Sequence, residues 1–266
     1  MNSEDGYRLK DEWRRAVKAA RELDVQTTFV LVTCVVFVFL QYMIGDRAVF
    51  LATVGEAVPD EWQELGSWVW WFGMQGVLGF LIPVLCLWGL FGRSAREMGL
   101  GWGDWKLASM LALAYIPLAA IGTWVLSDGA AFQAEYPHYG EAAYSWRIFL
   151  IYQAFFLLYW IGWEYLWRGY VLFGTAHTFG RYAIIVQMVP FAVLHFEKPP
   201  AEAFLSIVGA LVLGAIVWRC RAFWVAVPIH ASQMMLLDLW STLRIRTGVE
   251  GISPAALLEM LRQLGG

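Results

Sequence analysis

Residues 148–175 read IFLIYQAFFLLYWIGWEYLWRGYVLFGT, and Glu164 and Arg168 are their only charged members. At about 1.5 Å per residue, a helix of this length exceeds the roughly 30 Å thickness of a membrane's hydrocarbon layer. A charged side chain at mid-membrane costs roughly 2.5–3.5 kcal/mol on insertion scales. Such a residue is therefore found where another polar group pairs with it or where it serves a function. The stretch therefore predicts a membrane-spanning helix with a polar site inside it.

The composition of the whole chain agrees with this prediction. Of its 266 residues, 59% are hydrophobic and only 15% are charged, whereas a soluble domain carries about a quarter charged residues. The net charge of −3 excludes a generally basic, nucleic-acid-binding surface. The three cysteines lack CxxC spacing, which indicates neither a disulfide framework nor a thiolate metal site. We expect an integral membrane protein whose immediate partner is the lipid bilayer, with no nucleic acid partner.

Apolar stretches recur along the chain and predict an all-α, polytopic helix bundle. The pattern indicates about seven transmembrane helices, with eight as the alternative. The first four stretches are long enough to cross a bilayer, whereas the last three are shorter and indicate helices partly sheltered by protein. The stretches are 27–44, 67–92, 107–127, 148–175, 182–196, 203–218 and 222–237.

The chain divides into an amphipathic N-terminal segment (1–26), a transmembrane bundle (27–239) and a C-terminal tail (240–266). Leu9, Trp13 and Val17 recur at helical spacing in the first segment, which predicts a surface helix, and no cleavable signal is expected there. With the N-terminus inside, the inner segments hold twelve Lys and Arg residues and the outer segments six. Because positive loops stay on the cytoplasmic side, we expect a cytoplasmic N-terminus.

Ionisable residues inside the predicted spans are few, so they are the candidates for function. Besides Glu164 and Arg168 they include His195 in FAVLHF (191–196) and His230 in PIHASQ (228–233). Counted from the loop near Arg181, Glu164 and His195 both lie roughly 18–21 Å deep, and His230 lies about 13 Å deep on its own helix. One carboxylate and two imidazoles from three helices can therefore converge, as activation of a water molecule requires.

Simpler interpretations of the same residues also stand. Glu164 and Arg168 are four residues apart on one helix face, which is the spacing of an intrahelical ion pair that makes two buried charges tolerable. A histidine in a membrane span is often a polar contact between helices. His138 lies in a predicted loop and is expected to be solvated, although the aromatic segment around it could cap a cavity in the membrane.

Three segments, taken in order, resemble the CPBP family of CAAX-processing and bacteriocin-processing intramembrane proteases, also called Abi or Rce1-like. That family carries EExxxRG, FxxxH and HxxxN on successive membrane helices. The counterparts here are WEYLWRG (163–169), FAVLH (191–195) and HASQM (230–234), within a motif core of 147–237. Two positions differ: Trp163 replaces the first Glu of the first motif, and Met234 replaces the Asn of the third.

The resemblance implies an intramembrane endopeptidase in the cytoplasmic membrane of a bacterium, acting on a protein or peptide substrate. Glu164 with His195 would activate water, His230 would hold the oxyanion or complete a metal site, and Arg168 would orient Glu164 and keep it ionised. The family leaves two versions open: zinc held by Glu164, His195 and His230, or a metal-independent glutamate protease. Prenylated CAAX tails, leader peptides and C-terminal membrane anchors remain possible substrates.

Two further classes of protein fit the same residues. A family member that has lost its chemistry through Trp163 and Met234 would act as an immunity or scaffold protein. A small ion-coupled transporter could use Glu164, Arg168 and the histidines as a proton path. Transporters usually carry internal repeats, and the hydropathy pattern has none, which ranks that class last.

Overall fold

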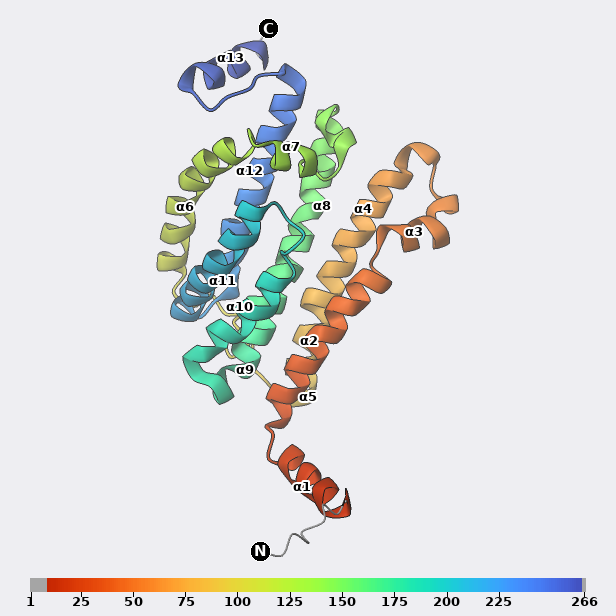
Figure 1. Ribbon diagram of the computed structural model, residues 1–266, viewed down its shortest axis with the longest axis vertical. Helices are drawn as coiled ribbons and strands as arrows, with labels where there is room; N and C mark the ends of the chain where they lie inside the picture. The colour runs from red at the N-terminus through yellow and green to blue at the C-terminus, as the bar shows by residue number, and fades with distance from the viewer. Residues whose placement is uncertain (1–8, 265–266) are drawn as a thin grey trace, which may run out of the picture.

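The computed structural model describes residues 9–264 as helices joined by loops, without a strand in that range (Figure 1). Five helical stretches are long and apolar enough to cross a membrane. They are α2 (Val25–Met43), α4 to α5 (Asp60–Phe91), α6 (Trp105–Leu126), α8 through α10 (Trp146–Val193) and α11 (Pro200–Cys220). The prediction of an all-helical, polytopic bundle is confirmed, and the chain is an integral membrane protein.

The ends of the bundle are formed by shorter helices. The first is the exposed α1 (Leu9–Arg21), which lies in the predicted N-terminal segment; residues 1–8 of that segment lie outside the described residues. The other short helices are α3 (Arg47–Thr53), α7 (Ala130–Glu135) and α13 (Pro254–Leu264). In Figure 1, α1 lies at one end of the molecule, and α3, α7 and α13 lie at the other.

Asp24 fixes the start of α2, directly after α1. Its Oδ1 accepts a hydrogen bond from the Thr27 backbone N–H at 2.7 Å and lies 2.8 Å from Nε2 of His177 in α9 (Leu172–Phe179). The Thr27 backbone N–H, and after it the contact with His177, lower the pKa of Asp24 to about 2. The carboxylate is therefore ionised at neutral pH, where it caps α2 and joins it to α9.

Helices α10 and α12 differ most from the predicted spans. A sharp turn at Gly180 (φ 54°, ψ −132°) separates α9 from α10 (Ala183–Val193), which is shorter than an ordinary span. The last long helix, α12 (Ala226–Thr247), runs ten residues beyond the predicted end at 237. Its outer half buries Asp238, Ser241, Thr242 and Arg244. These polar side chains ended the apolar pattern in the sequence although the helix continues.

Helices α4 (Asp60–Gly76) and α8 (Trp146–Glu164) make close backbone contact through glycine. A Cβ atom added to Gly162 would overlap the Gln75 carbonyl oxygen and lie 2.6 Å from its carbonyl carbon. Only a residue without a side chain permits this approach. The contact lies two residues before Glu164, so it sets the position of that side chain relative to α4.

Replacing Gly162 with alanine is expected to lower the stability of the folded protein by about 1–3 kcal/mol, because the added methyl group forces the two backbones apart. Thermal unfolding of the detergent-solubilised protein measures the effect. Gly122→Ala is the matched control, since nothing lies within 4 Å of its Cβ position. Equal melting temperatures for the two variants would contradict the close packing.

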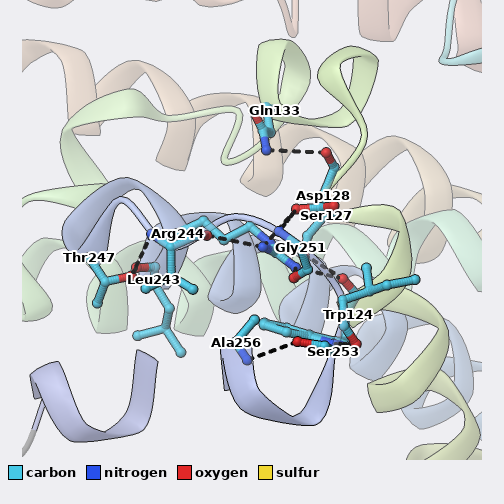
Figure 2. A network of polar contacts seen from close by, with 12 residues as sticks. Trp124, Ser127, Asp128, Gln133, Leu243, Arg244, Thr247, Gly251, Ser253 and Ala256 are labelled. Carbon is cyan, nitrogen blue, oxygen red and sulfur yellow. Dashed lines mark hydrogen bonds and ion pairs between the residues drawn. The ribbon is translucent and has the colours of Figure 1, made fainter. Parts of the chain in front are cut away.

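Arg244 ties the end of α12 to α6 and to the segment leading into α13 (Figure 2). Its guanidinium donates to Ser127 Oγ at 2.9 Å and to the Trp124 and Gly251 carbonyl oxygens at 3.2 and 3.1 Å. It also forms a 2.9 Å ion pair with Asp128. Because nearly every donor of the buried guanidinium has a partner, this contact fixes the end of the bundle farthest from α1.

Candidate active site

Glu164, Arg168 and His230 are in direct contact in the middle of the bundle. Glu164 Oε1 accepts from Arg168 Nη1 at 3.1 Å and lies 2.6 Å from His230 Nδ1. The Glu164 side chain is fully buried and that of Arg168 is 1% exposed. The predicted convergence of Glu164 with His230 is therefore present, and the intrahelical ion pair is present in the same cluster.

The backbone around this cluster is specialised. Glu164 is the last residue of α8, and the next segment, η4 (Tyr165–Val171), forms a π-helical turn before α9. Such turns inside helices occur frequently at functional sites. Every residue from 162 to 175 is buried. The site is therefore built on the most enclosed part of the described chain.

His195 stands beside this cluster. Its Nδ1 lies 2.7 Å from the Phe191 carbonyl oxygen, and its ring centroid is 4.5 Å from that of Phe191. The Phe191 ring is also 6.1 Å from the His230 ring, and the Arg168 guanidinium lies over it at 4.1 Å. Trp163 approaches His195 at 6.0 Å. The Phe191 ring thus lies near both predicted histidines. His195 makes no direct hydrogen bond to Glu164.

A cavity of about 340 Å³ connects the two histidines. The residues that line it include Trp160, Trp163, His195, His230 and Met234. Glu164 and Arg168 do not line it. Nδ1 of each imidazole is used, by Glu164 in one case and by the Phe191 carbonyl in the other, and no group among the described residues hydrogen bonds to either Nε2. Each histidine can therefore offer one free nitrogen to a molecule in the cavity.

The other end of the cavity carries charged residues that the sequence interpretation missed. Lys198 Nζ donates to Glu135 Oε1 at 2.6 Å and lies 3.4 Å from His138 Nε2. Burial, and after it the charge of Lys198, lower the pKa of His138 to about 4. His138 is therefore neutral at pH 7, and its Nε2 can accept from Lys198 while Nδ1 donates to the Glu135 carbonyl oxygen, 3.1 Å away.

A second contact joins the same loops. The Tyr136 hydroxyl lies 2.8 and 2.9 Å from the two carboxylate oxygens of Glu202, in the first turn of α11. The expectation that His138 is solvated is wrong, because the segment around it folds over the cavity and stacks its ring on Trp68. The aromatic character of that segment was the signal in the sequence. Nothing in the sequence indicated its partners, which lie about sixty residues away.

The arrangement does not fit a metal ion on the predicted ligands. Glu164 Oε1 is bonded to both His230 Nδ1 and Arg168, and His195 Nδ1 is turned to a backbone carbonyl. Within residues 9–264, no three His, Cys, Asp or Glu side chains are grouped as a metal site requires. Glu164, His195 and His230 therefore do not form a zinc site in this arrangement.

Comparison with known proteins agrees with the motifs. No curated protein and no solved structure shows a significant match to the chain. Residues 145–236, which contain all three motifs, match the family model described as Type II CAAX prenyl endopeptidase Rce1-like. The predicted resemblance is thus confirmed for this segment, which is similar to the Rce1-like, or CPBP, family of membrane endopeptidases.

Proposed function

We propose that this protein is an intramembrane endopeptidase that hydrolyses a peptide bond in the cavity between His195 and His230. The observation that carries the proposal is the hydrogen bond between Glu164 and His230 Nδ1, with a cavity at the other side of the same imidazole. A histidine held by a buried carboxylate is a general base whose tautomer is fixed and whose charged form is stabilised. The similarity of residues 145–236 to a family of endopeptidases supports the same class of reaction.

In the proposed mechanism His230 Nε2 removes a proton from a water molecule in the cavity. The water oxygen attacks the scissile carbonyl carbon, and the carbon–nitrogen bond breaks as His230 returns the proton to the leaving amine. His230 Nδ1–H stays bonded to Glu164, which stabilises the imidazolium between the two steps. His195 Nε2 accepts the second hydrogen of the water and so directs its lone pair to the carbonyl. One C–O bond forms for each C–N bond broken.

This assignment changes the roles expected from the sequence. The sequence resemblance implies that Glu164 with His195 activates water and that His230 holds the oxyanion or completes a metal site. Glu164 is fully buried and does not line the cavity, so a water molecule there meets the imidazoles first. Trp163, which stands where the family has its first Glu, lines the cavity with a ring that cannot accept a proton. The imidazole of His230 supplies the base that this position lacks.

We also propose seven crossings of the membrane. The crossings are α2, α4 to α5, α6, α8 to α9, α10, α11 and α12. An odd number is in keeping with the first and last described helices, α1 and α13, which lie at opposite ends of the molecule in Figure 1. Twelve Lys and Arg residues in the inner segments against six in the outer ones support a cytoplasmic N-terminus.

A cleavage assay tests the proposed function. The purified protein, reconstituted in liposomes, is incubated with three peptide classes: a prenylated C-terminal tail, a leader peptide and a C-terminal membrane anchor. We expect mass spectrometry to find one new peptide end from at least one class, and none with the His195→Ala/His230→Ala double variant. Equal cleavage by that variant, or no cleavage of any class, would leave a binding or scaffold protein as the better description.

A further inference from the structure

We infer that the catalytic cavity opens toward the non-cytoplasmic face of the membrane, so that the substrate is a peptide segment presented on that side. This inference rests on the proposed function. It narrows the substrate class to the membrane-proximal segment of an exported or membrane-anchored protein. Three observations carry it: the position of the charged cavity residues, the closure of the opposite end, and the distribution of positive charge.

The cavity is also lined by six charged or titratable residues at one end of the bundle. Asp46 and Arg47 stand where α2 turns into α3, Glu135 is the last residue of α7 and His138 follows it, Lys198 lies between α10 and α11, and Glu202 lies in the first turn of α11. We call these six residues the rim. Figure 1 places α3 and α7 at the end opposite α1. Because charged side chains need water, the rim marks the end at which the cavity meets solvent.

One rim residue, Lys198, is hydrogen bonded to His195 of the proposed reaction centre. Lys198 belongs to the same turn as His195, and its backbone N–H donates to the His195 carbonyl oxygen at 3.1 Å. A peptide that enters past the ion pair of Lys198 and Glu135 therefore arrives at His195 and then at His230. The cavity thus provides a continuous path from the rim to the proposed reaction centre.

The opposite end of the cavity is closed. Residues 162–175 are buried without interruption and include the large side chains of Trp167, Arg168 and Tyr170, none more than 1% exposed. This segment continues from the reaction centre into α9, toward the end of the molecule at which α1 lies (Figure 1). No residue of the loops 92–104, 175–182 or 220–225 lines the cavity. A substrate at that face would have to displace the most enclosed part of the described chain.

The distribution of positive charge indicates which end of the bundle faces the cytoplasm. The closed end carries the exposed cations of the loops near α1, such as Arg96, Arg181 and Arg219. The rim end includes the loop 45–66, which holds five acidic residues and one arginine. By the positive-inside rule the closed end is cytoplasmic, so a tail in the cytoplasm cannot reach the site without crossing the membrane.

Cysteine labelling tests the direction of opening without requiring activity. Cys34, Cys86 and Cys220 are replaced by alanine, and single cysteines are introduced as Met234→Cys in the cavity, Glu197→Cys beside the rim and Arg181→Cys at the closed end. We expect a small, membrane-impermeant thiol reagent added to intact cells to label the first two, and Arg181→Cys to react only after permeabilisation. Labelling of Met234→Cys from the cytoplasmic side only, or from neither side, would overturn the inference.

A pair of reporter substrates then separates this inference from the proposed function. Both carry the same membrane anchor and the same cleavable segment, placed at the outer boundary in one and at the inner boundary in the other. We expect cleavage of the outer reporter and complete loss of cleavage for the inner one. Cleavage of the inner reporter alone would overturn the sidedness and leave the protease intact. Cleavage of neither, with Met234→Cys labelled from outside, would overturn the protease and leave the sidedness intact.

Discussion

Glu164→Gln is expected to lower kcat about 10⁴-fold, the loss seen when the carboxylate behind a catalytic histidine becomes an amide. The glutamine side chain fills the same space between Arg168 and His230 and keeps a hydrogen-bonding oxygen. It carries no charge, so it cannot stabilise the imidazolium that forms when His230 takes a proton from water. Single-turnover cleavage measures the rate, and thermal unfolding shows whether the variant is folded.

The double variant Glu164→Gln/Arg168→Met is the control for the simpler interpretation. If Glu164 serves only to neutralise Arg168, removing both charges together should be nearly neutral, because buried ion pairs replaced as a unit often cost little. We expect the double variant to recover the stability that the single variant loses. We expect it to remain inactive. Near wild-type cleavage by the double variant would show that the pair has a structural role only.

His195→Ala is expected to lower kcat about 10²–10⁴-fold, the usual contribution of a positioned acid or base, with little change in folding. The reason is that His195 lines the cavity and its Nε2 has no partner among the described residues, while its Nδ1 is bonded to the Phe191 carbonyl oxygen of the same turn. Steady-state kinetics on the same reporter separate kcat from KM, and unfolding temperatures check the fold.

His177→Ala is the matched control for His195→Ala. It also removes a partly exposed imidazole, but one that contacts Asp24 at the far end of α9 and does not line the cavity. We expect its kcat to match that of the wild type. A rate for His195→Ala that matches the control would remove His195 from the site.

The helices were predictable where hydropathy alone decides them. α2, α6 and α11 follow from uninterrupted apolar runs, since no other structure satisfies the backbone inside a membrane. The outer half of α12 was missed because Asp238 faces Gln153 inside the bundle at 2.8 Å and Arg244 binds the end of α6. Such residues lower the hydropathy of a helix without ending the helix, and a sequence does not show that their partners exist.

The candidate site was predictable in its members and less so in its geometry. Counting residues along each helix placed Glu164, His195 and His230 at similar depth, and Glu164 and His230 are indeed in contact. The count fixes height but leaves the direction of each side chain open, since successive residues point about 100° apart. It therefore could not show that Trp163 lines the cavity while Glu164 lies behind His230.

The rim lay beyond such reasoning for a different reason. Glu135 and His138 meet Lys198 across about sixty residues of chain, and their loops gave no periodic signal. Contacts between loops depend on how the helices beneath them are arranged, which follows from side-chain packing rather than from local pattern.

One measurement tests the central claim, that water activated by His230 hydrolyses a peptide bond in this cavity, most directly. A reporter peptide is cleaved in oxygen-18 water under single-turnover conditions by the wild type and by His230→Ala, and the new carboxyl terminus is analysed by mass spectrometry. The account predicts one oxygen-18 atom in the product of the wild type and no product from a folded His230→Ala protein. Cleavage by His230→Ala at the wild-type rate would contradict it.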